Sequence, residues 1–278
     1  MTTHILLIDC PDEKGLVYRI TGELSRREFN IVSNHEFVDA STGHFFMRTA
    51  FEGSASPLAV LDNLKQTLPA EANIRLAPAE KRPIVLLVTR EPHCLGDLLL
   101  RHAYDELPAR ICAIVSNRDT LAPLAQKFGI PFHHVSHEGR EREEHEREIL
   151  QAIAPYRPDY LVLAKYMRVL TPQFVAQYPN RIINIHHSFL PAFIGASPYR
   201  QAFERGVKII GATAHIVTDD LDTGPILVQN VQPVDHSYSI AGMTQAGRDI
   251  EKIVLSKALK LVLEERVFLH HNRAIIFE

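Results

Sequence analysis

The sequence of 278 residues has no tryptophan and only three cysteines, Cys10, Cys94 and Cys112. These cysteines are odd in number and widely spaced, and no Cys-x-x-Cys pair is present. A disulfide framework is therefore disfavoured. We expect reduced, mostly buried thiols, as in a cytoplasmic protein.

Long apolar runs and strong charge of one sign are also missing. No run approaches the roughly 18 apolar residues that a membrane helix requires. The first residues have neither a basic segment nor a long apolar one, which argues against a signal peptide. The formal net charge of −3 gives no reason to expect a nucleic-acid or anionic-membrane partner.

The first part of the chain has the pattern strand, helix, strand, strand, helix, strand. Leu16, Ile20 and Leu24 share one helical face, and Ser41–Gly43 is a hairpin signal between two β-rich runs. This order predicts a ferredoxin-like βαββαβ domain with both helices on one face of an antiparallel sheet. A stretch with Pro78, Pro83 and several charges ends it, so we expect domains at 1–82 and 83–278.

The second part alternates apolar strand-like runs with amphipathic helices. Near-continuous apolar runs occur at residues 84–88, 111–117, 160–166 and 181–186. Such runs, separated by helices, predict a doubly wound, mostly parallel α/β sheet covered on both faces. A long helix is expected near the C-terminus, and the mixed charges between Arg140 and Arg147 predict a solvated helix face.

Ligands bind outside the carboxyl ends of the strands in such a sheet. Asn184 and His186 lie two residues apart at the end of a predicted strand, so their side chains point to the same face. Asp219, Asp220 and Asp222 follow a later strand, on a loop that Gly224 and Pro225 turn.

An amide, an imidazole and a carboxylate suit attack on a carbonyl carbon. Asn184 can stabilise an oxyanion, and His186 can donate or accept a proton near neutral pH. Asp222 can orient water, take its proton, or hold the imidazole charged. Taken alone, an Asn-x-His pair is more often a loop cap or a core hydrogen bond.

The sequence motifs give little support for a metal site or a nucleotide-binding site. The 15 histidines include the adjacent pairs His133-His134 and His186-His187, but no His-Glu-x-x-His or Cys-x-x-Cys spacing accompanies them. Leu221 interrupts the spacing that a calcium loop would need. No Gly-x-Gly-x-x-Gly follows the first strand of the second domain, so a nicotinamide site is not expected. We expect neither a metal nor a cofactor.

The ordered motifs "NIHHSFLPAF" and "HIVTDDLDTGPILVQ" resemble those of the folate-dependent formyltransferase and hydrolase superfamily. The resemblance implies catalytic roles for Asn184, His186 and Asp222, with His215 supporting the aspartate. The segment "KYMRVLTPQFV" is similar to the family's pterin-binding stretch. Folate contacts are thus implied for the following residues: Met167, Arg168, Val169, Leu170, Asp219 and Asp220.

Two further features narrow the resemblance to the formyltetrahydrofolate deformylase family. Residues 88–99, "VTREPHCLGDLL", contain only Gly96, so the glycine-rich nest that a phosphorylated amine acceptor requires is missing. The N-terminal segment resembles an ACT domain, which binds small amino acids and commonly pairs edge to edge. The residues implied in effector binding are Asp12, Gly15, Leu16, Asn30 and Ile31.

The resemblance implies a cytoplasmic hydrolase that converts 10-formyltetrahydrofolate to formate and tetrahydrofolate. It also implies formate supply for purine synthesis, a glycine or methionine effector, and a homo-oligomer, dimer or tetramer. Two alternatives stay open. One is a formyltransferase to an amine whose phosphate is absent or bound elsewhere, and the other is a regulatory binding protein whose catalytic fold is inactive.

Overall fold

The computed structural model describes residues 2–191 and 198–278. The chain divides into two compact units, one of Met1–Glu80 with Phe277–Glu278 and the other of Lys81–Ile276. The division thus falls two residues before the expected one, and the last two residues group with the N-terminal unit.

The N-terminal unit has the predicted ferredoxin-like order. Its four-stranded antiparallel sheet runs β2-β3-β1-β4. Leu16, Ile20 and Leu24 are buried, which confirms the helical face predicted from their spacing. The elements are β1 (Thr3–Pro11), α1 (Leu16–Arg26), β2 (Asn30–Asp39), β3 (His44–Glu52), α2 (Leu58–Thr67) and β4 (Asn73–Leu76).

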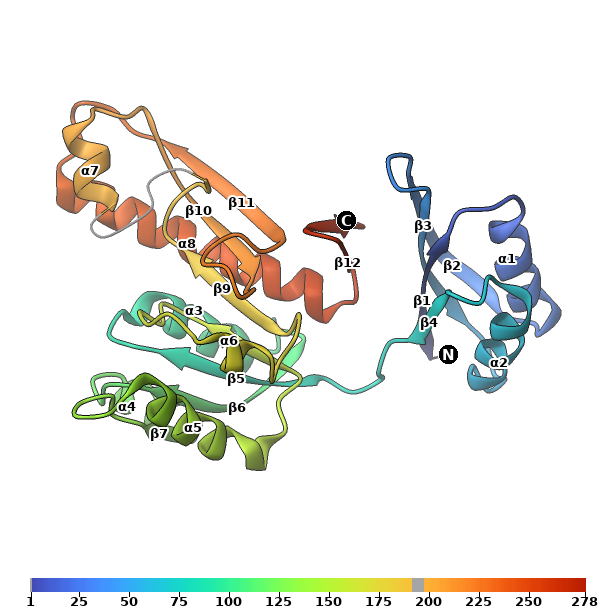
Figure 1. Ribbon diagram of the computed structural model, residues 1–278, viewed down its shortest axis with the longest axis horizontal. Helices are drawn as coiled ribbons and strands as arrows, with labels where there is room; N and C mark the ends of the chain where they lie inside the picture. The colour runs from blue at the N-terminus through green and yellow to red at the C-terminus, as the bar shows by residue number, and fades with distance from the viewer. Residues whose placement is uncertain (1, 192–197) are drawn as a thin grey trace. The chain divides into compact units, whose positions relative to one another are not determined.

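The larger unit is built on a seven-stranded sheet in the order β11-β10-β9-β8-β5-β6-β7 (Figure 1). The strands from β9 to β7 in this order are parallel, and β10 and β11 are antiparallel additions at one edge. The mostly parallel sheet was predicted. Its strands are β5 (Arg82–Val88), β6 (Ala109–Ser116), β7 (Phe132–His134), β8 (Tyr160–Leu163), β9 (Ile182–His186), β10 (Ile209–Ile216) and β11 (Ile226–Pro233).

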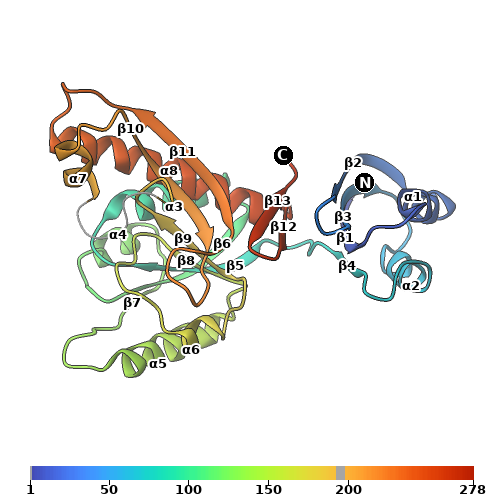
Figure 2. The same ribbon diagram turned by 45° about the horizontal axis from the view of Figure 1, so that its top comes forward.

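Helices cover both faces of this sheet (Figure 2). Alternate residues of β5 face opposite sides, so Leu86 joins the core beneath α3 and α8, while Leu87 joins the core beneath α5 and α6. A strand buried on both faces must be apolar throughout, as this one is. The helices are α3 (Pro92–Ala103), α4 (Ala122–Lys127), α5 (Arg142–Ile153), α6 (Pro172–Val175), α7 (Pro198–Glu204) and α8 (Ile240–Leu263).

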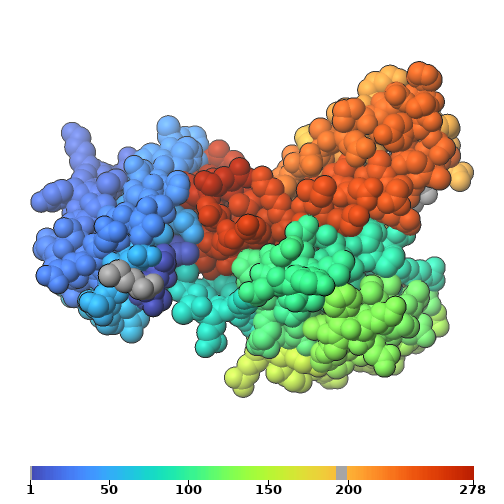
Figure 3. All heavy atoms as spheres, turned by 180° about the vertical axis from the view of Figure 1, so that it is seen from behind, coloured from blue at the N-terminus to red at the C-terminus, as the bar shows by residue number. Residues whose placement is uncertain are grey.

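The long C-terminal helix α8 packs on β9, β10 and β11 and against α3. Figure 3 shows the orange-red surface of α8 adjoining the blue-green surface of α3. Leu255 and Leu259, one turn apart, are fully buried. Within residues 2–191 and 198–278, no helix is both long and apolar enough to cross a membrane.

Several short elements carry too few residues for a periodic signal, and the sequence did not predict them. They are β7, α6, the 3-10 turn Ala154–Tyr156, and the hairpin of β12 (Val267–His270) and β13 (Arg273–Ile276). The charged stretch forms α5 with Arg147 exposed as expected, but Glu146 on the same helix is buried. The carboxylate of Glu146 accepts hydrogen bonds from the backbone N–H and the hydroxyl of Thr171, which explains that burial.

Candidate active site

The register between β9 and β10 brings the first polar groups together. Asn184 lies opposite His215, and His186 lies opposite Thr213. Residues directly opposite in an antiparallel pair have neighbouring side chains. Asn184 Nδ2 is accordingly 3.2 Å from His215 Nε2. His186 and His215 are both buried.

Asp222 reaches both histidines from the loop between β10 and β11. Its carboxylate oxygens lie 3.3 Å from His186 Nδ1 and 3.5 Å from His215 Nε2. Asp222 has a left-handed backbone, φ +56°, which aspartate tolerates better than most residues. A Cβ on Gly224 would lie 2.0 Å from the carbonyl oxygen of Ile216, so only glycine lets this loop fold back so tightly.

The two histidines keep Asp222 ionised. Burial alone would raise the pKa of the Asp222 carboxyl, but hydrogen bonds to His186 and His215 and their positive charge lower it well below its ordinary value. The carboxylate is therefore charged at neutral pH. It can hold an imidazolium or a water molecule in place.

Hydrogen bonding also shows that one particular ring nitrogen of His215 carries a proton. Its Nδ1 lies 2.9 Å from the carbonyl oxygen of Ile216, which only accepts, so Nδ1 carries the proton. Nε2 lies 3.2 Å from the Asn184 amide nitrogen and 3.5 Å from the Asp222 carboxylate. The amide of Asn184 is thereby oriented, and its second N–H remains to bind a substrate oxygen.

These groups line one cavity of about 290 Å³ in the larger unit. Nε2 of His186 is buried and has no hydrogen-bond partner among the described residues. Such an atom is available to a ligand. All the residues implied in catalysis or folate binding line the cavity: Met167, Arg168, Val169, Leu170, Asn184, His186, His215, Asp219, Asp220 and Asp222.

The segment Met167 to Leu170 is held at both ends. The backbone N–H of Met167 donates to Thr89 Oγ1 at 3.1 Å. At the other end, the N–H of Thr171 donates to Glu146 Oε1 at 2.8 Å, and its hydroxyl donates to Glu146 Oε2. These bonds leave the exposed Met167 and Val169 side chains on a fixed backbone beside the polar groups of the cavity.

The loop after His186 is held from the neighbouring strand. The buried hydroxyl of Thr213 donates to the carbonyl of Ser188 at 2.9 Å and accepts from the N–H of Leu190 at 3.1 Å. Gln229 on β11 donates to the carbonyl of Leu190 at 3.1 Å. The chain leaving β9 is thus fixed up to Leu190.

The residues implied in effector binding do not meet within one chain. Asn30 is aligned with Glu52 and Thr3, at the start of β1, whereas Asp12 and Gly15 follow the end of β1. A strand of this length spans about 25 Å. Gly15, with φ +89°, forms the turn before α1, and Leu16 is buried, while Ile31 follows Asn30 on the edge strand β2.

A second polar cluster lies at α3 and α8, outside the cavity lining. His93, Cys94 and Glu251 present ligand-type atoms within 4.8 Å of one another. Lys165 Nζ, however, is 3.2 Å from Glu251 Oε1, and burial raises the pKa of the Cys94 thiol. A nearby ammonium and a protonated thiol both oppose cation binding. The three cysteines are buried and unpaired, as predicted.

The fold and the cavity define a protein class. The formyl transferase family matches residues 82–259, and the ACT domain family matches residues 4–68. The catalytic half is thus that of a formyl-group-handling protein, joined to an ACT domain.

Whole-chain relatives narrow the class. The chain is 55% identical to formyltetrahydrofolate deformylase from Haemophilus influenzae, over 98% of each chain. It is 58% identical to that of Escherichia coli strain K12, over 98% of this chain and 97% of the relative. The crystal structure of the Pseudomonas syringae deformylase superposes with a TM-score of 0.94 at 38% identity, covering 99% of this chain and 94% of that one. This chain belongs to the formyltetrahydrofolate deformylase family.

The sequence did not predict several residues that hold the segments around the cavity, namely Thr89, Glu146, Thr213 and Gln229. None of these residues belongs to a sequence motif with a distinctive spacing.

Proposed function

We propose that this protein hydrolyses 10-formyltetrahydrofolate to formate and tetrahydrofolate. The main support is the convergence of Asn184, His186 and Asp222 on one cavity, beside the clamped segment Met167 to Leu170. Relatives that match the whole chain at 55–58% identity are named for this activity. The formate would serve purine synthesis.

In the proposed mechanism, the formyl carbon lies between Asn184 and His186. The free N–H of Asn184 and the protonated Nε2 of His186 hold the oxygen that becomes negative when water attacks. Asp222 holds the water and accepts a hydrogen bond from Nδ1 of His186. Because its pKa is lowered, the Asp222 carboxylate is a weak base in the resting site, so it holds the water electrostatically and takes a proton only as the C–O bond forms.

The proton balance of the reaction needs no other reactant. As the C–O bond forms, the attacking water becomes acidic and loses one proton to the Asp222 carboxylate, and N10 gains that proton. The C–N10 bond then breaks, giving formic acid, which ionises to formate. We propose that neither a metal nor a cofactor takes part, since the polar groups of the cavity supply both the oxyanion donors and the charge.

The experiment that tests the function measures formate and tetrahydrofolate from the purified protein without any amine. Stoichiometric release of both products is expected. A requirement for an amine acceptor would favour a formyltransferase instead, and neither reaction with retained amino-acid binding would favour a regulatory protein.

We further propose that the ACT domain binds glycine or methionine between two copies of the chain. If two β2 strands pair in antiparallel fashion, the Asn30 end of one lies beside the Asp39 end of the other. That second end is the one that carries the turn from Asp12 to Leu16. A dimer or tetramer would thus unite the two halves of the site. The buried free cysteines support a reducing, cytoplasmic location.

A further inference from the structure

A buried carboxylate on α8 holds three side chains that the proposed mechanism does not use. Glu251 is 1% exposed. Its Oε2 lies 2.6 Å from His93 Nε2, and its Oε1 accepts from Lys165 Nζ at 3.2 Å and from the Tyr199 hydroxyl at 2.7 Å. Burial alone would raise the pKa of Glu251, but these partners lower it to about 2, so the carboxylate is charged.

The three partners lie in segments that follow three strands of the sheet, at the carboxyl ends of those strands. His93 starts α3 after β5, Lys165 follows β8, and Tyr199 lies in the helix that follows β9. These strands are neighbours in the order β9-β8-β5, and all three run parallel. Glu251 therefore bonds to one side chain from each of the segments that follow these three adjacent strands.

Two local backbone features fit this arrangement. A Cβ on Gly247, one turn before Glu251 on α8, would lie 2.1 Å from the Tyr199 hydroxyl oxygen, so glycine is needed for the tyrosine to reach the carboxylate. Lys165 has a left-handed backbone, φ +64°. Such a conformation is strained for a non-glycine residue and persists only when its surroundings hold it.

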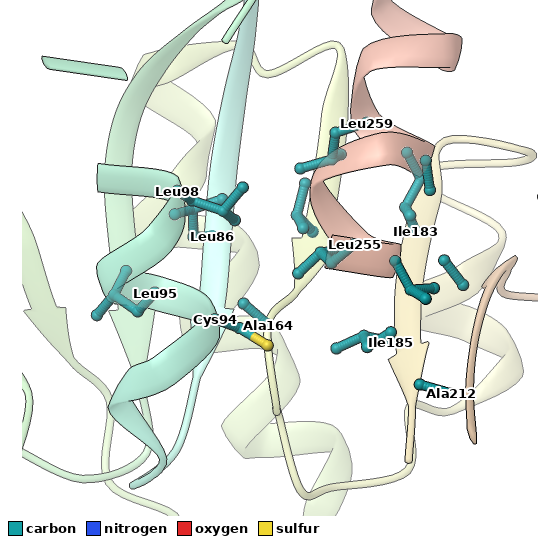
Figure 4. Close-up of a cluster of buried hydrophobic side chains, with 14 of the residues drawn as sticks. Leu86, Cys94, Leu95, Leu98, Ala164, Ile183, Ile185, Ala212, Leu255 and Leu259 are labelled. Atoms are coloured by element: carbon teal, nitrogen blue, oxygen red, sulfur yellow. The ribbon is translucent and has the colours of Figure 1, made fainter. Parts of the chain in front are cut away.

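The same cluster makes a poor metal site. Figure 4 shows the Cys94 sulfur beside Ala164, the residue before Lys165, among buried apolar side chains. That surrounding favours the neutral thiol, and the Lys165 ammonium occupies one oxygen of Glu251. The cluster is an ion-paired hydrogen-bond network.

We infer that Glu251 is a positioning residue for folate binding and hydrolysis. It acts from outside the cavity, because neither Glu251 nor its three partners line it. Lys165 lies two residues before Met167, and Tyr199 follows the loop that leaves His186. Through Lys165 the network fixes the predicted pterin-binding segment, and through Tyr199 it fixes the first turn of α7.

This inference rests on the proposed function and has a kinetic test. Glu251→Gln leaves Lys165 buried without its counter-charge, and Lys165→Met removes the anchor of the β8 loop. Each single variant is expected to reduce kcat/KM by roughly 10- to 100-fold, since small displacements of a catalytic site are that costly. Lys165→Met should act mainly by raising KM. The double variant should lose less than the product of the single losses, because no unpaired buried charge remains.

Glu265→Gln is the matched control. Glu265 is also a buried glutamate, 4% exposed, and it pairs with Arg82 rather than with a cavity loop. We expect this variant to lower Tm with kcat and KM unchanged. Circular dichroism at the assay temperature establishes that each variant is folded.

Two results would overturn the inference. One is a Glu251→Gln variant whose Tm falls while kcat and KM stay unchanged, as expected of the control. The other is stoichiometric zinc in the purified protein that Cys94→Ala removes. Calorimetric binding of tetrahydrofolate, weaker in Glu251→Gln than in wild type, tests positioning without turnover. Failure of the proposed function gives a different result, namely no formate from the wild-type protein.

Discussion

Asp222 Oδ2 lies 3.3 Å from Nδ1 of His186, although His186 ends β9 and Asp222 lies on the loop between β10 and β11. This pair leaves His186 Nε2, on the other side of the ring, buried and without a hydrogen-bond partner in the described parts of the chain. The ring is thus oriented by a carboxylate and directed at a ligand, which is the arrangement that general acid catalysis requires.

Replacing Asp222 by asparagine should reduce kcat by roughly 10² to 10⁴, the usual contribution of a positioned acid–base group. Asparagine keeps the size of the side chain and tolerates the left-handed backbone, so the change isolates the charge. Formate release is the measurement, and Asp235→Asn, on an exposed loop, is the control. A near-wild-type rate in Asp222→Asn would remove this residue from the mechanism.

Removing the imidazole should have a comparable effect. His186→Ala loses the proposed proton donor to the oxyanion and leaves Asp222 with His215 as its only histidine partner among the described residues. We expect kcat to fall by roughly 10² or more. His236→Ala, which removes an imidazole from the turn after β11, serves as the control.

The lowered pKa of Asp222 predicts a particular dependence of stability on pH. A carboxyl whose pKa is depressed by folding stabilises the protein fully above its unfolded pKa, and this contribution is lost as pH falls through the folded pKa. The difference in unfolding free energy between wild type and Asp222→Asn should therefore be constant near neutral pH and shrink below about pH 4. Urea unfolding from pH 7 to pH 3 measures it. A difference that grows on acidification would contradict the predicted sign.

Gly224→Ala should displace the loop that carries Asp222, because the new Cβ would lie 2.0 Å from the carbonyl oxygen of Ile216. Overpacking of this kind costs about 1–3 kcal/mol of stability, and we expect most activity to be lost. Gly96→Ala on α3 is the matched control, since a Cβ at that position would meet no atom of another described segment within 4 Å. It should leave both stability and activity near wild type.

Chelation should leave formate release unchanged if the reaction is metal-free. The assay compares protein dialysed against EDTA with untreated protein. Loss of activity that added zinc restores would show that a metal takes part.

Amino-acid binding should require two chains. Asn30→Ala is expected to weaken the binding of glycine or methionine in calorimetry, whereas Lys65→Ala on α2 should not. Light scattering across a dilution series should show binding disappear as the oligomer dissociates. Full binding by a monomer would contradict the shared site.

The sequence alone determined the class of both units. Strand and helix periods are local properties, so β1 to β4 and the parallel sheet followed from the apolar pattern. Asn184 and His186 could be paired because residues two apart in a strand share a face. The strand pattern placed Asp222 on a loop after a later strand, but its distance from His186 could not be derived from sequence spacing.

Tertiary structure decided which of these groups meet. His215 reaches Asn184 through the register of β9 with β10, and Glu251 reaches Lys165 across 86 positions of sequence. Conversely, Asn30 and Asp12 belong to one motif in the sequence but lie at opposite ends of the sheet. Periodicity fixes which face a side chain takes, whereas strand register and loop closure fix its neighbours, and these depend on packing between distant segments.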